Sequence, residues 1–483
     1  MVIGESDGPP AAAHGGTGLP DTVRRVLVLG ASRSGASAAL ALTNLGLEVI
    51  LSDRREPASL PGLAAAAAAG ARFQLEGALE ESWPRPDLVI KSPGVPGEAG
   101  PVVLARRRGV PVWSELELAY ALFPNPFDAI TGTNGKTTTT ALLGHLFAAA
   151  GRPARVLGNI GVAVTSVAGE IAPDEELVVE VSSFQLEDVH AFRPAVGVFL
   201  NLTPDHLDRH GSMECYLACK ANLFAGQRAG DVAVLNLSDP FVAGLGLELA
   251  GRPDGPRVAF FSATARTGGR QLVSWIEDGW VYLEEERVIR VSDIRLPGVH
   301  NLENCLAAGT AALARGLAPG AVAEGLGSFG GVAHRLERAG MVAGVTYVND
   351  SKATNVEATL TALNAYPERT HLILGGRDKA SDYRPVARAC ARGCKAVYLI
   401  GEATPLIEAA FSEVRDEEMA QGVPETLVCG DLETAVRTAA RRSTAGDVVL
   451  LAPACASFDQ YGNFEERGEH FCELVRHLAG ETP

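Results

Sequence analysis

Short apolar runs, each about the length of one buried strand, recur along this chain and alternate with helix-like segments. Most of the runs end in a turn rich in glycine or polar residues. Strands that are apolar throughout are typical of parallel sheets, whose two faces are covered by helices. The sequence therefore predicts an α/β fold with mainly parallel sheets. The predicted strands lie at 25–29, 48–51, 88–90, 129–131, 177–180, 196–200, 232–235, 345–348, 372–374, 396–400 and 448–451.

The chain has 483 residues, which suggests about three domains. Residues 1–22 are rich in Gly, Pro and Ala and are expected to form a disordered tail. A break at 124–126 and a glycine-rich linker at 325–331 divide the rest into units at 23–124, 125–331 and 332–483. Alternating apolar and polar residues at 273–291 predict a small antiparallel sheet.

Charge and composition exclude several classes of partner. The formal net charge of −16 argues against nucleic acid or an anionic membrane as the main partner. No apolar run is long enough to span a bilayer, and the first residues lack the features of a signal peptide. The eight cysteines follow no disulfide framework, and the pairs Cys215/Cys219 and Cys390/Cys394 are more typical of structural thiols than of zinc ligands. A reducing cytoplasm is expected.

The segment from Gly132 to Thr137 is the strongest chemical motif in the chain. It follows a predicted strand and precedes a helix, although Ile130 replaces the first glycine of the full Walker spacing. Backbone N–H groups of such a loop wrap phosphates, Lys136 reaches the outer ones, and the Thr137 hydroxyl can bind Mg²⁺. A glycine-rich turn that arose by chance is the weaker alternative. The sequence therefore predicts an ATP-using enzyme.

A second glycine loop, Gly30 to Gly35, also joins a strand to a helix. Ser32 stands where the dinucleotide fingerprint has its middle glycine, so the motif could equally be a tight turn with a helix cap. Asp53 ends the next strand, at the position where an acidic residue binds a sugar hydroxyl. The loop also suggests a nicotinamide dehydrogenase, which Ser32 disfavours. Arg33 receives no role.

Lysine is scarce here: only six of the 42 basic residues are Lys, at positions 91, 136, 220, 352, 379 and 395. A lysine kept in such a chain is a candidate for chemistry that a guanidinium cannot perform. Lys220 lies on a helix predicted over 214–227, shortly after His206. Glu180 ends a predicted strand, and we expect its carboxylate to bind Mg²⁺. His206 lies just past another strand in the same layer of loops, which favours a role in the site. A capping carboxylate, a structural histidine and a solvated lysine are the alternative interpretations.

Further polar clusters follow the later strands, at the edge where open α/β sheets bind ligands. Arg335 and Lys352 are suited to the charge of a phosphoryl group in transfer. Thr354, Lys379 and Ser457 could hold a carboxylate of a second substrate.

Taken together, the sequence resembles the Mur ligases from about Val23 to the C-terminus. The resemblance rests on the phosphate loop and on five further stretches, namely Gly158–Gly161, Glu180–Glu187, Asp205–His206, Asn349–Val356 and Pro453–Gly468. The phosphate loop alone would also fit sister Mur ligases and folylpolyglutamate synthases, whereas the last two stretches are similar to those of the D-glutamate-adding branch.

The resemblance implies a Rossmann-like UDP-sugar-binding domain, a central P-loop ATPase domain and a Rossmann-like C-terminal domain that binds the amino acid. It implies a cytoplasmic ligase of peptidoglycan precursor synthesis that forms an acyl phosphate with ATP and two Mg²⁺ ions. The expected substrates are UDP-N-acetylmuramoyl-L-alanine, D-glutamate and ATP, with no nucleic acid and no membrane, and the protein is expected to be a monomer.

Site residues carried over from the family fall into five groups. ATP contacts are Gly132, Thr133, Asn134, Gly135, Lys136, Thr137, Thr138, Asn301, Asn304, Arg335, Asp350 and Lys352. Metal ligands are Thr137, Glu180, His206 and a carbamylated Lys220, and the catalytic residues are Lys136, Lys220 and His206. UDP-sugar contacts are Ser34, Gly35, Asp53, Arg54, Ser92, Gly94 and Asn159. D-Glutamate contacts are Thr354, Lys379, Ser457 and Phe464. A nucleotide-binding regulator or an ATPase without ligase activity remains an alternative.

Overall fold

The computed structural model divides the chain into two compact units, Met1–Phe329 and Gly330–Pro483. The structure describes residue 16 and residues 18–60, 62–79, 82–159, 162–263, 271–296, 298–379, 381–417 and 422–480. Most of the expected disordered tail lies outside these residues. Its described end contacts the first unit, because the N–H groups of Gly16 and Gly18 donate to the carbonyl oxygens of Tyr120 (2.9 Å) and Ala121 (3.0 Å).

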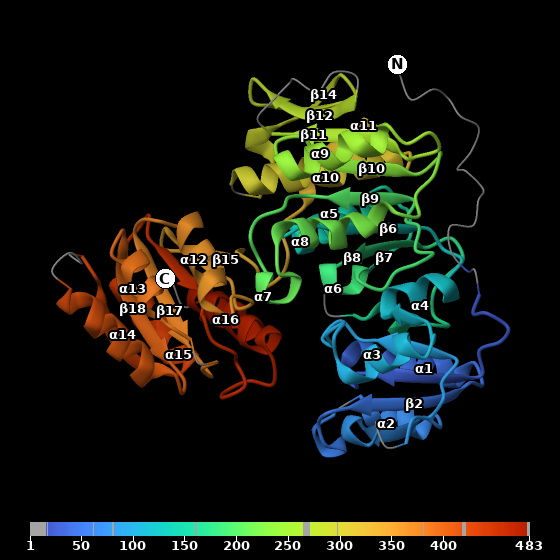
Figure 1. Cartoon of the computed structure of the whole chain (residues 1–483). Helices are drawn as coiled ribbons and strands as arrows, with labels where there is room; N and C mark the ends of the chain where they lie inside the picture. Colours follow the sequence, from blue (N-terminus) through green and yellow to red (C-terminus); the bar gives the residue numbers. More distant parts are fainter. Residues whose placement is uncertain are drawn as a thin grey trace. The chain divides into compact units, whose positions relative to one another are not determined.

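The first sheet has five parallel strands in the order β3-β2-β1-β4-β5. Figure 1 labels its strand β2 and its helices α1, α2 and α3 in the blue part of the chain. Buried residues form one apolar cluster under α1, α2 and α4 and a second cluster against α3. The strands are β1 (Arg25–Leu29), β2 (Glu48–Asp53), β3 (Arg72–Leu75), β4 (Leu88–Lys91) and β5 (Val112–Ser114). The helices are α1 (Arg33–Asn44), α2 (Leu63–Ala68), α3 (Gly100–Arg107) and α4 (Glu115–Leu122).

Helix α4 packs against both the first and the second sheet. Its Leu118 packs in the core of the first sheet, whereas Leu116 and Tyr120 pack in the core of the second. The buried carboxylate of Glu117 accepts the N–H groups of residues 190, 191 and 192 at 2.7–3.1 Å. These shared contacts explain why both sheets fall in one compact unit.

The second sheet has nine strands in the order β14-β13-β12-β11-β10-β9-β6-β8-β7. The seven strands from β12 to β7 are parallel, and β13 and β14 are antiparallel. The strands are β6 (Phe127–Thr131), β7 (Ala154–Gly158), β8 (Glu176–Glu180), β9 (Val196–Phe199), β10 (Val232–Asn236), β11 (Arg257–Ser262), β12 (Leu272–Glu277), β13 (Trp280–Leu283) and β14 (Glu286–Arg290). The helices are α5 (Lys136–Ala149), α6 (Ser183–Leu186), α7 (Leu207–His210), α8 (Met213–Ala221), α9 (Pro240–Ala250), α10 (Val299–Ala314) and α11 (Pro319–Ser328).

The second unit is built on one sheet in the order β15-β16-β20-β17-β18-β19, in which only the pair β15 and β16 is antiparallel. Helices α12–α14 contribute to the apolar cluster on one face, and α15 and α16 contribute to that on the other. The strands are β15 (Glu337–Val342), β16 (Val345–Asn349), β17 (Thr370–Gly375), β18 (Cys394–Ile400), β19 (Glu425–Gly430) and β20 (Val448–Leu451). The helices are α12 (Val356–Ala365), α13 (Arg384–Cys390), α14 (Thr404–Asp416), α15 (Leu432–Arg442) and α16 (Phe464–Gly480).

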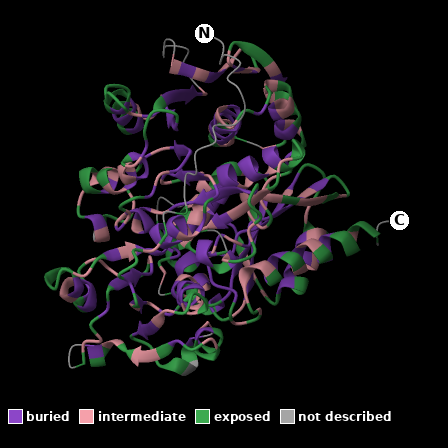
Figure 2. Cartoon of the chain, turned by 90° about the vertical axis from the view of Figure 1, so that its right-hand side faces the viewer, coloured by how far each residue is buried: buried purple, intermediate pink, exposed green. Residues whose placement is uncertain are grey.

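The predicted fold class is confirmed, since all three sheets are mainly parallel. Figure 2 shows the buried residues along the strands and the inner faces of the helices. Among the helices of the described residues, none is both long and apolar enough to cross a bilayer. The exact domain boundaries proposed from the sequence stay predictions.

Three local expectations need correction. The alternating segment at 273–291 does form the antiparallel strands β12, β13 and β14, but these strands extend the central sheet, because β12 pairs in parallel with β11. Helix α11 continues to Ser328, so the expected linker at 325–331 is partly helical; a side chain at Gly325 would clash with Leu146, which shows close packing there. Helix α8 ends at Ala221, short of the predicted end at 227.

Candidate active site

The phosphate loop leaves β6 and enters α5 with a backbone that needs glycine. Gly132 and Gly135 have φ values of 153° and 84°, in the region that favours glycine. A Cβ atom at Gly135 would lie 2.3 Å from Asn304 Oδ1. The glycine conformations bring the loop tightly against the start of α5, and the N-terminus of a helix suits an anion such as a phosphate.

The segment that follows β9 holds this loop in place. Asn201 Oδ1 accepts the N–H of Asn134 (2.9 Å), and its carbonyl oxygen accepts the N–H of Thr133 (3.0 Å). The Thr133 hydroxyl also accepts the N–H of Thr203 (3.1 Å). These bonds fix the loop before any nucleotide arrives, which lowers the entropy cost of binding.

Two lysine amines donate hydrogen bonds to the carbonyl oxygen of Gly132. Lys136 Nζ donates to Gly132 (2.9 Å) and Thr133 (2.8 Å), and Lys220 Nζ donates to Gly132 (2.9 Å). Lys220 is buried and lies over the ring of Tyr216, 4.7 Å from its centroid. Burial and then the charge of Lys136 lower the pKa of Lys220 to about 7. A large fraction of this amine is therefore uncharged near neutral pH, unlike an ordinary lysine.

Glu180 ends β8 beside the start of α5. Its Oε2 accepts the hydroxyl of Thr137 (2.8 Å), and its Oε1 accepts the amide N–H of Asn159 (2.8 Å). The structure thus brings together Thr137 and Glu180, two oxygen donors of the kind that Mg²⁺ prefers. Asn159 was expected at the UDP-sugar, and it also orients this carboxylate.

His206 lies further out, with its side chain about half exposed. Its ring contacts Asp205 (Nε2 to Oδ2, 3.5 Å) and packs against Phe184, with centroids 4.9 Å apart. Within the described part of the chain, no three His, Cys, Asp or Glu residues form a ready metal cluster. The expected ligand set of Glu180, His206 and Lys220 stays a prediction, because lysine is not one of these residue types.

Asn301 and Asn304 approach the phosphate loop from α10. Asn304 Oδ1 accepts the hydroxyl of Thr139 on α5 (3.2 Å), and Asn301 Oδ1 accepts an amide N–H of Asn304 (3.2 Å). Asn304 therefore lies against the phosphate loop and Asn301 lies beside it, and their contact with the nucleotide stays a prediction.

The first glycine loop is tied to the end of β2. Asp53 Oδ2 accepts the N–H of Ala31 (2.8 Å), and Arg55 pairs with both oxygens of Asp53 and with the hydroxyl of Ser32. Hydrogen bonding to Arg55 outweighs burial and holds the pKa of Asp53 well below its usual range. The Ser92 hydroxyl donates to the carbonyl of Gly30 (3.0 Å). In the same segment, Arg54 pairs with Glu76 at the surface (3.0 Å).

A cavity of about 180 Å³ lies between this loop and the central sheet. Ser34 and Asn159 line it, as two of the residues expected at the UDP-sugar, and Arg33 lies beside them. Gly94 follows Pro93, another lining residue, in an exposed turn. Ile160 and Gly161, which complete the expected motif, lie outside the described residues.

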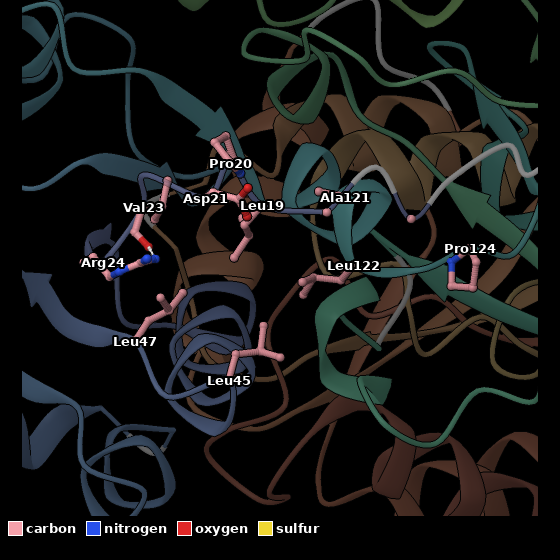
Figure 3. Close-up of a pocket in the computed structure, with 12 residues that line it drawn as sticks. Leu19, Pro20, Asp21, Val23, Arg24, Leu45, Leu47, Ala121, Leu122 and Pro124 are labelled. Carbon is pink, nitrogen blue, oxygen red and sulfur yellow. Dashed lines mark hydrogen bonds between the residues drawn. The ribbon is translucent and has the colours of Figure 1, made fainter.

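A larger cavity of about 480 Å³ lies elsewhere in the first unit (Figure 3). It is lined by Leu19, Arg24, Leu45, Leu47 and Leu122 among others, and by no residue expected in the site. Arg24 precedes β1 and Leu47 precedes β2, so this cavity is at the amino ends of the strands. Open parallel sheets bind ligands at the other edge.

In the second unit, Arg335, Asp350 and Lys352 lie together. Asp350 Oδ1 accepts the N–H of Leu336 (3.3 Å), and the N–H of Lys352 donates to the carbonyl of His334 (3.1 Å). Burial raises the pKa of Asp350 to about 6, although the Leu336 N–H and the charges of Arg335 and Lys352 oppose that rise. The expected nucleotide contacts of this unit thus form one cluster.

Replacing Asp350 by Asn is expected to remove a pH-dependent step in stability. In the folded unit Asp350 keeps its proton up to about pH 6, against an ordinary value of 3.8, so folded stability falls as pH rises between these values. The asparagine amide carries no charge, so calorimetry should show that Asp350→Asn gains unfolding temperature relative to wild type at pH 7.5 but not at pH 4. The exposed Asp416→Asn is the control, and an equal shift in both variants would contradict the expectation.

Thr354, Lys379, Ser457 and Phe464 lie in four segments near the carboxyl edge of the same sheet. Lys379 Nζ donates to the carbonyl of Thr354 (3.3 Å), which joins the first two. Lys352 Nζ lies 5.8 Å from the centre of the Phe464 ring. The backbones of Arg377 and Ala456 pair as a β-bridge, which places Lys379 and Ser457 on neighbouring loops.

The sequence of this chain matches known protein families and known proteins. The Mur ligase middle domain matches residues 130–312, and the Mur ligase glutamate ligase domain matches residues 334–455. A UDP-N-acetylmuramoylalanine–D-glutamate ligase of Pelotomaculum thermopropionicum is 44% identical over 95% of this chain and 98% of its own length. The chain belongs to the Mur ligase family. A ligase of the same name from Geobacillus kaustophilus is 40% identical and covers 94% of this Mur ligase.

Solved structures agree with this Mur ligase in fold. A UDP-N-acetylmuramate–alanine ligase from Thermotoga maritima has a TM-score of 0.55 at 20% identity, covering 94% of this chain and 99% of its own. A UDP-N-acetylmuramoyl-L-alanyl-D-glutamate–2,6-diaminopimelate ligase also has a TM-score of 0.55 at 20% identity, covering 89% and 93%.

Sequence reasoning overlooked several residues that shape the sites of this Mur ligase. Asn201 is the second residue after β9, so its position at the carboxyl edge of the sheet was a usable signal. Arg55 follows Asp53 by two positions, but nothing in the pattern distinguished it from Arg54. Arg467 is recognisable only from its burial, which an arginine on a helix does not reveal in sequence.

Proposed function

We propose that this protein is an ATP-dependent ligase that joins D-glutamate to UDP-N-acetylmuramoyl-L-alanine in cytoplasmic peptidoglycan precursor synthesis. The observation that carries the proposal is 40–44% identity, along nearly the full length of both chains, to relatives named as D-glutamate ligases. The preformed phosphate loop with its two lysines supplies the ATP side of such a reaction.

The chemistry has two stages. The alanyl carboxylate of the UDP-sugar attacks the γ-phosphorus of ATP, which gives an acyl phosphate and ADP. The D-glutamate amine then attacks the acyl carbon, phosphate leaves from the tetrahedral intermediate, and the amine loses a proton. Lys136 and the N–H groups of the phosphate loop hold the negative charge of the γ-phosphate during the first stage.

The residues beside the loop fit Mg²⁺. Thr137 and Glu180 present oxygen ligands at the buried end of β8. His206 lies on the loop after β9, which is separated from β8 by β6 in the sheet. Bound there, Mg²⁺ would neutralise charge on the phosphates of ATP.

Lys220 is proposed to carry a carbamate. Its amine lone pair attacks the carbon of CO₂, an N–C bond forms, and the amine releases a proton. Only an uncharged amine can react in this way, and the burial of Lys220 favours that form. The carbamate would give the Lys220 side chain oxygen atoms that can bind a second Mg²⁺.

The substrates are assigned to two further places. The UDP-sugar is proposed to bind at the first glycine loop and at the cavity lined by Ser34 and Asn159. The D-glutamate carboxylates are proposed to bind at Lys379, Thr354 and Ser457, with Phe464 alongside.

The test is phosphate release from ATP in the presence of UDP-N-acetylmuramoyl-L-alanine and one amino acid at a time. D-Glutamate should stimulate release, whereas L-glutamate, L-alanine and meso-diaminopimelate should not. If the rate of phosphate release does not depend on the UDP-sugar, the protein is a different kind of ATPase and the proposal is wrong.

A further inference from the structure

Arg467 is among the largest fully buried side chains of the protein, with only 1% of its surface exposed. It lies in the first turn of α16, three residues after Phe464. Burial lowers the pKa of Arg467 to about 10, so the guanidinium remains charged at neutral pH. Burial of a cation costs free energy unless its N–H groups donate hydrogen bonds. The hydrogen-bond partners of Arg467 therefore indicate its role.

Its hydrogen bonds go to neutral oxygens of two separate loops. Arg467 Nε donates to the hydroxyl of Ser351 (3.0 Å), and Nη2 donates to the carbonyls of Ser351 (3.0 Å) and Cys455 (3.1 Å). Nη1 reaches the carbonyl of Ala456 (3.4 Å). Ser351 follows β16 and Cys455 follows β20, which are adjacent strands.

A third loop and the start of α16 also lie against Arg467 or its partner Ser351. The Ser351 hydroxyl donates to the carbonyl of Phe464 (2.8 Å). A Cβ atom at Gly376 would lie 3.1 Å from Arg467 Nη1 and 2.3 Å from the carbonyl oxygen of Ala456, so the loop after β17 passes against the guanidinium. The four segments are therefore packed around one side chain.

These are the segments that carry Thr354, Lys379, Ser457 and Phe464. Thr354, Lys379 and Ser457 are each within three positions of a residue that contacts Arg467 or lies against it, and Phe464 is three positions before Arg467 itself. The positive charge at their centre also has the sign that a dicarboxylate amino acid requires. Asp459 favours the charged form of Arg467 through space, while its own Oδ2 accepts the N–H of Glu402 (3.1 Å).

We infer that Arg467 is a positioning residue for the acceptor amino acid: it fixes the three loops and the helix start that form the carboxylate-binding pocket. The inference rests on the proposed function, because it takes the acceptor to be an anionic amino acid. Arg467 acts through the loops and has no part in forming the acyl phosphate.

The experiment separates the two stages of the reaction in the full-length protein. Arg467→Lys keeps the charge but loses the planar fork, and Ser351→Ala removes one contact. The KM for D-glutamate is expected to rise about 10- to 100-fold in Arg467→Lys and less in Ser351→Ala. The KM for ATP should stay within about twofold. Arg476→Met, on the exposed side of the same helix, is the matched control and should match wild type.

Hydroxylamine provides the second measurement, since it captures the acyl phosphate as a hydroxamate without D-glutamate. Hydroxamate formation should be preserved in folded Arg467→Lys. An unchanged KM for D-glutamate in both variants, or a parallel loss of hydroxamate, would overturn the inference. If wild type itself shows no response to D-glutamate but still forms hydroxamate, the proposed acceptor is wrong, and that result is distinct from failure of the role of Arg467.

Discussion

Replacement of Lys220 by Ala is expected to lower kcat by about 10²–10³-fold, the effect of removing one charge-stabilising group from a reaction centre. The Lys220 amine is buried beside the phosphate loop, and burial lowers its pKa, which favours the uncharged form. If its carbamate supplies a ligand, then a short carboxylic acid such as acetate or formate should enter the space left in Lys220→Ala and restore part of the activity. ADP release measured against acid concentration checks this.

Lys220→Arg is the discriminating control. Arginine keeps a positive charge but cannot accept CO₂, so it should be as inactive as Lys220→Ala and should not respond to added acid. Near wild-type activity of Lys220→Ala, or of Lys220→Arg, would contradict the carbamate proposal. A decrease in melting temperature common to both variants would point to folding instead.

Replacement of Lys91 by Met is expected to destabilise the first unit by about 3–5 kcal/mol, the usual cost of removing one partner from a buried ion pair. Lys91 is 1% exposed, and its Nζ lies 2.7 Å from Glu187 Oε2 and 3.1 Å from Asp188 Oδ2. Arg209 pairs with the same Glu187 and donates to the carbonyls of Pro93 and Val95. The pairs therefore connect the loop after β4 to the central sheet.

The tryptophans make this measurement specific, because Trp83, Trp113, Trp275 and Trp280 all lie in the first unit. Denaturant unfolding followed by tryptophan fluorescence should show the loss for Lys91→Met. Arg106 pairs with Asp188 from a half-exposed position, so Arg106→Met should cost only about 0–1 kcal/mol. Equal effects of the two variants would show that burial does not decide the strength of this network.

Strand positions were predictable because apolar runs report burial on both faces of a sheet. β1 and β20 lie where the sequence placed them, and β6, β8 and β17 differ by a few residues at their ends. β3, β7 and β19 were missed because they are short or partly exposed and so lack a continuous apolar run. The attachment of β12 to β11 depends on pairing between distant segments, which no local pattern contains.

The individual site residues divide in the same way. Thr137 and Glu180 could be predicted to meet, since each follows or ends a parallel strand and the carboxyl ends of such strands share one edge. The same rule placed Lys379 and Ser457 on neighbouring loops. It could not show that Asn159 binds Glu180, or that Arg55 holds Asp53 while Arg54 turns to the surface.

The scarcity of lysine illustrates what each level determines. The sequence by itself determined the α/β class, the phosphate loop and a short list of lysines worth attention, because these follow from local pattern and residue type. Tertiary structure decided what each amine does: Lys220 is buried beside the phosphate loop, Lys91 closes an ion-pair network, and Lys395 pairs with the buried Asp447. The physical reason is that burial and neighbouring charge set the protonation of an amine, and both arise from contacts between residues far apart in the chain.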